Sequence, residues 1–295
     1  MPRGSGTRSK TLKLLETLKG SHKLGDEEVW VLAEVARLNK LYLAYLRAVK
    51  GVLEGELLRE EARYRWFMRN VAEVVNVLKG LNYALYKFRK PVEHVSVDLD
   101  ILIDRRDVSR AVQALVSQGF KVVIEEPYTV TLMRRGFIVD LYTEPSFAWV
   151  VYMDGGRLLG GHVEEVEVNG VQARVLTKEA EVVVAAAHAV YKEHVVLLMD
   201  CLVAWSWMDK KACGIAADKG VEEALEALVQ VCSLARTGAI ETPYKLKPHT
   251  LAKALFNKFV KDPVFRATVM NMAKYMVATR SAGSKVLTRL TRKSY

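Results

Sequence analysis

Asp98 and Asp100 stand two residues apart within residues 95–103, a mostly apolar segment in which hydrophobic and polar positions alternate. This period of two predicts a β-strand, so both carboxylates project from one face, with Cα atoms about 7 Å apart. Adjacent carboxylates repel each other and lose hydration, and a divalent cation is the usual way to offset both effects. The pattern therefore predicts a metal site, although the same aspartates would also fit the solvated end of an edge strand or the caps of neighbouring loops.

Asp140 repeats this arrangement within the apolar segment 137–142. If its strand pairs near the first, three carboxylates converge. Such a trio could hold two Mg²⁺ or Mn²⁺ ions about 4 Å apart, one bridging nucleotide phosphates and one lowering the pKa of an attacking hydroxyl. This is the chemistry of nucleotidyl transfer, so Asp98, Asp100 and Asp140 are candidate catalytic residues and metal ligands.

Residues 77–141 resemble the polymerase-beta-type nucleotidyltransferase superfamily, in particular its poorly characterised prokaryotic branch. In that branch a helix ending in Lys-Gly precedes an Asp-x-Asp-hydrophobic strand, and Lys79-Gly80 and residues 97–103 look similar to these two features. A helix with histidines and an aspartate farther along also resembles that branch, so the likeness extends over roughly residues 71–208.

The resemblance implies a role for each part of the site. Asp98 and Asp100 would ligate the metal that carries the triphosphate of a nucleoside triphosphate. Asp140 would serve the second metal and activate the acceptor. Lys79 and Gly80 would stand where the superfamily has its phosphate-contacting glycine-serine turn.

The residue after Gly80 is Leu81, where the superfamily has a serine. Phosphate binding at this turn would then rely on backbone amides, on Asn82 or on Lys79. Farther along, Lys192 shares a helical face with the residue four positions earlier and would reach phosphate if this helix lines the cleft. The predicted nucleotide-binding residues are thus Lys79, Gly80, Asn82 and Lys192.

Two functions follow from these residues. The preferred one is metal-dependent transfer of a nucleoside monophosphate from a nucleoside triphosphate to an unknown acceptor, which could be RNA, a protein or a small molecule. The alternative is a catalytically degenerate member that keeps the fold and acts as a nucleic-acid-binding or scaffolding protein, which the absence of the serine after Gly80 makes credible.

The apolar periodicity predicts an α/β (α+β) protein with a small mixed-sheet core over residues 71–176, and the resemblance implies that this core is nucleotidyltransferase-like. Helical regions with basic tails flank this core on both sides, over residues 1–70 and 177–295. Residues 155–161, rich in glycine, are expected to form a flexible turn. Helices are expected over 26–52, as one long or broken helix, and over 56–78, 107–118, 178–208, 221–237, 249–260 and 262–278. Strands are expected over 95–103, 121–124, 129–133, 137–142 and in a hairpin over 163–175 that turns at Asn169-Gly170.

The 295-residue chain is half apolar and carries a net charge of +10, which is concentrated at its ends. Residues 243–295 contain twelve Lys and Arg against a single acid, Asp262, whereas residues 25–242 have an excess of acids. A basic terminal segment is typical of a protein that binds a polyanion, so nucleic acid is a possible partner of the C-terminal region. A plain solvated surface is the other interpretation.

Cys201, Cys213 and Cys232 are odd in number and widely spaced, which argues against a disulfide framework and against a thiolate zinc site. A reducing compartment fits this cysteine content. No uninterrupted run of eighteen apolar residues is present, so no membrane-spanning segment is expected. We therefore expect a cytoplasmic protein without a membrane partner; the sequence does not reveal its oligomeric state.

Overall fold

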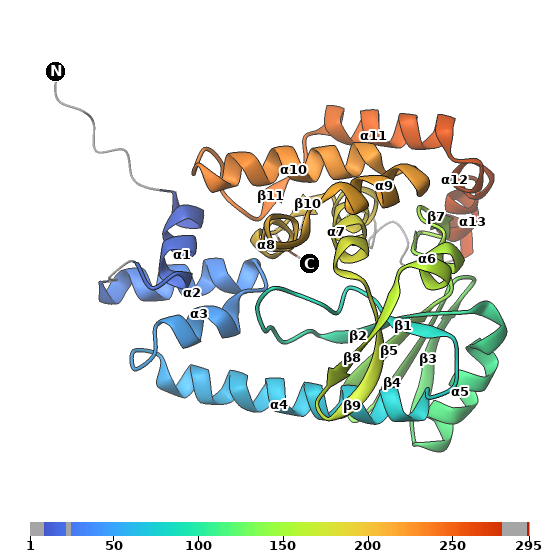
Figure 1. Ribbon diagram of the computed structural model, residues 1–295, viewed down its shortest axis with the longest axis horizontal. Coiled ribbons are helices and arrows are strands. Elements are labelled where there is room, and N and C mark those ends of the chain that lie inside the picture. Colours follow the sequence, from blue (N-terminus) through green and yellow to red (C-terminus); the bar gives the residue numbers. More distant parts are fainter. Residues whose placement is uncertain (1–8, 22–24, 279–293, 295) are drawn as a thin grey trace.

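The computed structural model describes residues 9–21, 25–278 and 294. Within them, seven strands form one mixed sheet in the order β3-β4-β5-β2-β1-β9-β8 (Figure 1). The predicted α/β class, with a mixed sheet between helical regions, is confirmed. The strands of this sheet are β1 (Tyr83–Leu85), β2 (Asp98–Ile103), β3 (Lys121–Glu126), β4 (Thr129–Arg134), β5 (Phe137–Tyr142), β8 (Val163–Val168) and β9 (Val171–Leu176).

Two pairs of short strands form small separate sheets: β6 (Ser146–Phe147) with β7 (Val150–Val151), and β10 (Val195–Val196) with β11 (Tyr244–Lys245). In the part of the chain that the structure describes, no helix has the length and apolar character needed to span a membrane. The helices are α1 (Lys10–Leu18), α2 (Asp26–Leu38), α3 (Tyr42–Ala48), α4 (Glu54–Val77), α5 (Val108–Ser117), α6 (Gly155–Gly161), α7 (Lys178–Ala187), α8 (Leu198–Trp207), α9 (Lys210–Asp218), α10 (Glu222–Arg236), α11 (Pro248–Lys261), α12 (Pro263–Thr268) and α13 (Asn271–Ala278).

The acidic strand β2 lies in the middle of the sheet, parallel to β5 and antiparallel to β1. Its register with β5 places Asp100 directly opposite Asp140. The predicted convergence of the two acidic strands is thereby confirmed. It could not be derived from the sequence because strand pairing is a long-range property.

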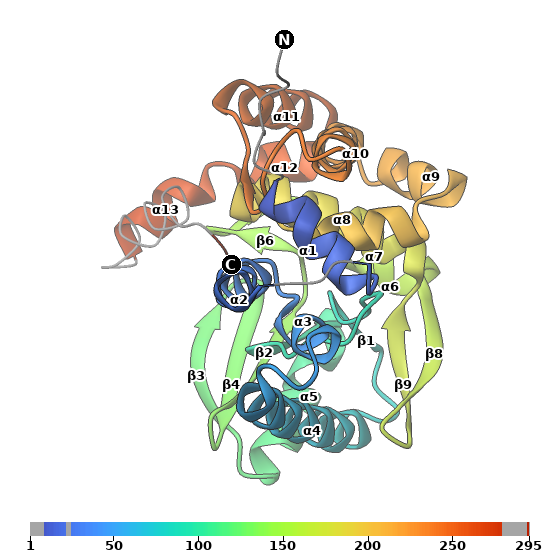
Figure 2. The same cartoon turned by 90° about the vertical axis from the view of Figure 1, so that its left-hand side faces the viewer.

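One face of the sheet is apolar and is covered by α4 and α5. Leu99, Ile101 and Ile103 of β2 point to this face and pack in one buried core with Val71 of α4 and Leu115 of α5. Figure 2 shows α4 and α5 on one side of the molecule and the C-terminal helices α8, α10 and α11 on the other. Since side chains alternate along a strand, burial of the odd-numbered residues of β2 turns its aspartates to the opposite face.

The opposite face carries the aspartates and borders the second core. Tyr86, Leu102 and Tyr142 contribute to this core together with residues of α2, α3, α7, α8 and α10. The N-terminal and C-terminal helices therefore share one apolar interior, although they are far apart in the sequence. The predicted limits of the central domain lie inside α4 (residues 70/71) and between β9 and α7 (176/177), and they stay predictions.

Two predicted long helices are broken, each at a residue with left-handed backbone. Lys40 (φ 58°) separates α2 from α3 within the expected helix 26–52. The expected helix 178–208 consists of α7, a π-helix over His188–Glu193, a stop at His194 (φ 59°) and then α8. A left-handed residue cannot continue a right-handed helix, and apolar periodicity does not reveal such a residue unless it is glycine.

The glycine-rich segment forms a short helix, α6, so the expected flexible turn was wrong. Asp154 caps this helix by accepting a hydrogen bond from the N–H of Arg157. Gly155 packs so closely on the sheet that a Cβ atom there would lie 2.4 Å from the carbonyl oxygen of Thr143. Close backbone approach, not flexibility, explains this glycine.

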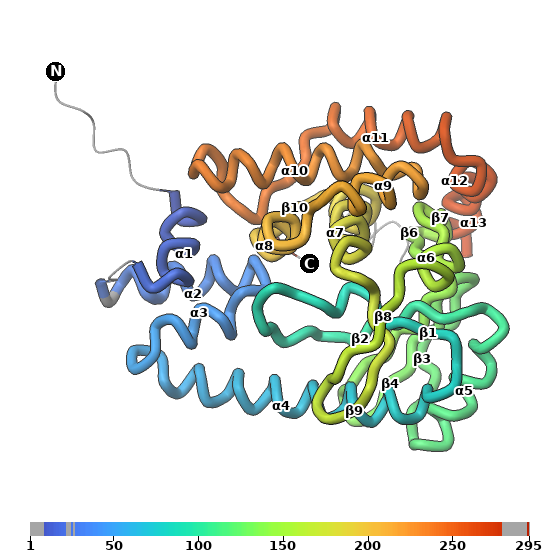
Figure 3. The backbone as a smooth tube through the Cα atoms, in the orientation of Figure 1, coloured from blue at the N-terminus to red at the C-terminus, as the bar shows by residue number. Residues whose placement is uncertain are grey.

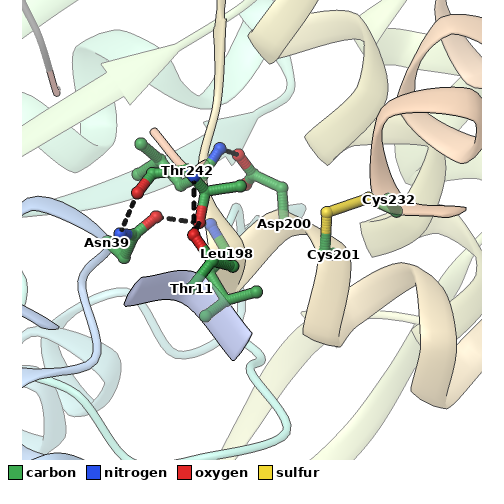
Figure 4. Close-up of a disulfide and its surroundings, with 8 residues drawn as sticks. Thr11, Asn39, Leu198, Asp200, Cys201, Cys232 and Thr242 are labelled. Atoms are coloured by element: carbon green, nitrogen blue, oxygen red, sulfur yellow. Dashed lines mark hydrogen bonds between the residues drawn. A yellow bond between two sulfur atoms is a disulfide. The ribbon is translucent and has the colours of Figure 1, made fainter. Parts of the chain in front are cut away.

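Cys201 of α8 and Cys232 of α10 form a disulfide bond (Figure 4). The expectation that the cysteines form no disulfide was therefore wrong, and the reducing compartment inferred from them loses its support. Sequence spacing was a poor guide here because α8 and α10 pack side by side while their cysteines lie 31 residues apart. Cys213 remains a free, exposed thiol.

Candidate active site

Three carboxylates converge on the face of the sheet opposite α4 and α5. One oxygen from each of Asp98, Asp100 and Asp140 can be chosen so that all three lie within 4.8 Å of one another. Among the residues that the structure describes, this is the only group of three or more His, Cys, Asp or Glu side chains so placed. The arrangement is suited to a divalent cation with oxygen ligands.

One carboxylate oxygen of this cluster receives no hydrogen bond and is available to a cation. Asp100 is only 8% exposed, and its Oδ1 atom is buried without a hydrogen-bond partner. Its other oxygen, Oδ2, lies 2.9 Å from the Nζ atom of Lys87. A buried carboxylate oxygen without a donor is unfavourable, so these residues fit a bound metal ion.

Neighbouring hydroxyl groups orient the other two carboxylates. Ser96 Oγ donates to Asp98 Oδ1 over 3.2 Å, and Thr131 on the adjacent strand β4 donates to Asp140 Oδ1. Thr131 reaches Asp140 because these residues are register partners across β4 and β5. The carboxylates are thus held in place by the same sheet that brings them together.

The nearby carboxylates change the pKa of Asp140. Burial and then the Asp100 carboxylate raise the pKa of Asp140 to about 6, with a smaller contribution from Asp98. The hydrogen bond from Thr131 works in the opposite direction. The neighbouring carboxylates therefore oppose the ionisation of Asp140, which a divalent cation would relieve.

A cleft of about 740 Å³ opens beside the carboxylates. Its walls come from the α2–α3 turn, α4, residues 90–98, the sheet, and the segment from α7 to α8. Arg37 and Arg59 of this lining pair with Glu56, and Arg63 pairs with Glu60. The cationic members of the lining are Arg37, Lys40, Arg59, Arg63, Lys87, Lys90 and Lys192.

The structure brings four of the predicted site residues together. Asp98, Asp100, Asp140 and Lys192 all line the cleft. The Nζ atom of Lys192 lies 5.3 Å from the ring centroid of Tyr142, two residues after Asp140 on the same face of β5. Lys192 is thus within the cleft, as expected if its helix forms one wall.

The turn with Lys79, Gly80 and Asn82 lies outside the cleft. The next residue, Tyr83, pairs with Ile103, at the opposite end of β2 from Asp98, and none of the three lines the cleft. The Asn82 side chain instead contacts Asp104 and Arg174. A nucleotide-binding role for these three residues stays a prediction, and the proposals below do not depend on it.

Three lysines of the cleft were missed by the sequence analysis: Lys40, Lys87 and Lys90. Lys87 lies two residues after the end of β1, a strand of three residues that is too short to give a clear alternation signal. Lys40 lies in a break that interrupts a helical pattern. The run Lys87-Phe88-Arg89-Lys90, shortly before the acidic strand, was the available signal for a cationic counterpart to the aspartates.

Comparison with known proteins gives one positive result. A family model described as an uncharacterised nucleotidyltransferase matches residues 56–226, more than half of the chain. The matched segment begins in α4, contains the whole sheet and ends in α10. None of the curated proteins matches the chain.

Proposed function

Because the chain belongs to the uncharacterised nucleotidyltransferase family, we propose that it transfers a nucleoside monophosphate from a nucleoside triphosphate to an acceptor, with pyrophosphate as the leaving group. The observation that supports this activity is the direct pairing of Asp100 with Asp140 across two parallel strands, with Asp98 on the same face. Phosphoryl groups carry charge that must be neutralised during transfer, and a carboxylate-bound metal is a common solution.

Asp98, Asp100 and Asp140 would hold Mg²⁺ or Mn²⁺. Bound there, the cation would neutralise phosphate charge and make the acceptor hydroxyl more acidic. In this proposal Asp98 and Asp100 face the triphosphate and Asp140 faces the acceptor. Lys192 lies on the same side of the cleft as Tyr142 and would contact phosphate from the helical wall.

The acceptor class stays open among RNA, protein and small molecules, and we propose that nucleic acid contacts the basic C-terminal region. The support is the charge of residues 243–295, which contain twelve Lys and Arg against a single acid, Asp262. The predicted tail over residues 280–295 lies almost wholly outside the described residues. Lys258 does not belong to this surface, because it is buried and pairs with Asp262 and with backbone carbonyls of residues 219 and 220.

The proposal is tested by incubating the purified chain with a cell extract, Mg²⁺ or Mn²⁺, and α-labelled nucleoside triphosphates. We expect label in an extract component, and we expect Asp140→Asn to abolish it while nucleotide binding survives. Asp209→Asn is the matched control, because Asp209 caps α9 and asparagine is an equally good cap.

Sensitivity of the labelled material to RNase or to protease would identify the acceptor class. Absence of label with all four nucleotides and both metals would contradict the transferase. It would favour the alternative, a degenerate member of the family that binds nucleic acid or serves as a scaffold.

A further inference from the structure

The cleft has a cationic wall beside its carboxylates, and part of that wall lies outside the family-matched segment. Lys87 and Lys90 come from the loop between β1 and β2, residues 86–97. Lys40 comes from the turn between α2 and α3, which precedes residue 56. The tube in Figure 3 shows the β1–β2 loop extending from the sheet toward α3.

The β1–β2 loop is fixed so that its lysines face the cleft. The buried Glu181 carboxylate of α7 accepts hydrogen bonds from the backbone N–H groups of Phe88 (3.0 Å) and Arg89 (3.3 Å). Arg89 itself turns away from the cleft to pair with Glu164. Lys87 and Lys90, on either side of this anchored pair, line the cleft.

A second anchor joins the far end of the β1–β2 loop to the N-terminal helices. Glu93 pairs with Arg47 of α3 and accepts a hydrogen bond from the hydroxyl of Tyr64 in α4 (2.9 Å). The loop is therefore fastened to α7 at one end and to α3 and α4 at the other. Its cationic side chains therefore extend from a loop that is anchored at both ends.

Lys40 is held by its neighbour Asn39, which is completely buried. The Asn39 side chain donates to the carbonyl of Thr242 (2.9 Å) and accepts from the N–H of Leu198 (2.8 Å), as Figure 4 shows. These bonds fasten the end of α2 to the C-terminal helices. Lys40 follows in left-handed conformation, which ends the helix and places this lysine at the cleft.

The lysines of this wall repel one another. Burial and then the Lys87 charge lower the pKa of Lys40 to about 8, and Lys90 adds to this effect. His94 in the same loop has its pKa lowered to about 3 by burial and by Lys90 and Lys40, so it is neutral at physiological pH. Lysines gathered along one cleft create a positive potential that attracts anions.

We propose that Lys40, Lys87 and Lys90 form an anion-binding site for the triphosphate of the nucleotide, completed by the α2–α3 turn that the family match does not include. The inference rests on the proposed function for the identity of the anion. Lysine ammonium groups are common phosphate ligands, and here they line the same cleft as the carboxylate cluster, which Lys87 contacts at Asp100 Oδ2 (2.9 Å). Metal and triphosphate would thus be held next to each other in one cleft.

The test measures binding of inorganic triphosphate to the full chain in EDTA, by calorimetry at low salt. We expect the natural chain to bind and Lys40→Gln to bind roughly tenfold to a hundredfold more weakly, the range expected for one charge-assisted hydrogen bond. Lys40→Arg, which keeps the charge, should retain most of the affinity. Lys50→Gln is the matched control, because Lys50 is an exposed lysine near the end of the same helical segment.

Mn²⁺ binding, measured separately, distinguishes this proposal from the proposed function. Lys40→Gln should bind Mn²⁺ like the natural chain, which also shows that the variant is folded. Asp98→Asn with Asp100→Asn should lose Mn²⁺ but still bind triphosphate in EDTA. Equal triphosphate affinity for Lys40→Gln and the natural chain, or no binding by the natural chain, would overturn the anion site whatever the result for the metal.

Discussion

At the scale of single residues, the cleft brings a group of carboxylates and a group of lysines side by side. Asp98, Asp100 and Asp140 repel one another on the sheet, and Lys87 neutralises part of this charge through its 2.9 Å contact with Asp100. Although burial works in the opposite direction, the Asp100 and Asp98 carboxylates raise the pKa of Lys87 above its usual value. Lys40 lies in a more cationic environment, and its pKa moves downward.

The lowered pKa of Lys40 predicts how triphosphate binding depends on pH. Charged groups that act on Lys40 are Lys87, Lys90, Asp98 and Asp200. With a pKa of about 8, Lys40 is charged at pH 7 and neutral at pH 9, so affinity should fall as pH rises through this range. One titrating group gives at most about a tenfold loss per pH unit.

This dependence is measured by triphosphate titrations in EDTA between pH 7 and pH 9. Lys40→Arg should flatten the profile, because a guanidinium does not titrate in this range. Identical profiles for the natural chain and Lys40→Arg would show that another group is responsible.

At the scale of elements, α6 shows how closely the backbone must approach the sheet. A Cβ atom on Gly155 would lie 2.4 Å from the Thr143 carbonyl oxygen and 2.9 Å from Leu102 Cδ1. Leu102 is fully buried, two residues after Asp100 on the same face of β2. Any shift of α6 therefore acts on the strand that carries the site.

We predict that Gly155→Ala destabilises the fold by about 1–3 kcal/mol, the usual range for overpacking a tight interior. Gly160→Ala is the matched control, since a Cβ atom at Gly160 meets nothing within 4 Å. Urea unfolding followed by circular dichroism measures both. A Gly155→Ala variant as stable as the natural chain would show that α6 can move away from the Thr143 carbonyl without loss of stability.

The same elements show where sequence patterns suffice. Alternation correctly predicted the strands around Asp98 and Asp140, and the Asn169-Gly170 turn correctly predicted the β8–β9 hairpin, because both signals are local. The pairing of β2 with β5 and the disulfide are long-range contacts and could not be derived from spacing. The sequence allowed a break in the helix over 26–52 but did not locate it at Lys40, because a left-handed lysine has no distinctive sequence signal.

At the scale of the whole molecule, the cleft is assembled from three parts of the chain. The sheet supplies the carboxylates, the N-terminal helices supply Lys40, and the segment from α7 to α8 supplies Lys192. The helices at both ends share one apolar core, so the walls are fixed relative to each other. The candidate metal ligands could be predicted from the sequence, whereas the cationic wall required the fold.

The central claim is that Asp98, Asp100 and Asp140 hold a divalent cation, and calorimetric titration with Mn²⁺ in the presence of a nucleoside triphosphate tests it most directly. The matched control is Asp104→Asn with Asp107→Asn, two aspartates beyond the opposite end of β2 that lie outside the carboxylate cluster. We predict that Asp98→Asn with Asp100→Asn abolishes Mn²⁺ binding while the control variant binds like the natural chain. Mn²⁺ binding of equal affinity by the Asp98→Asn, Asp100→Asn variant would contradict the metal site and the function proposed for it.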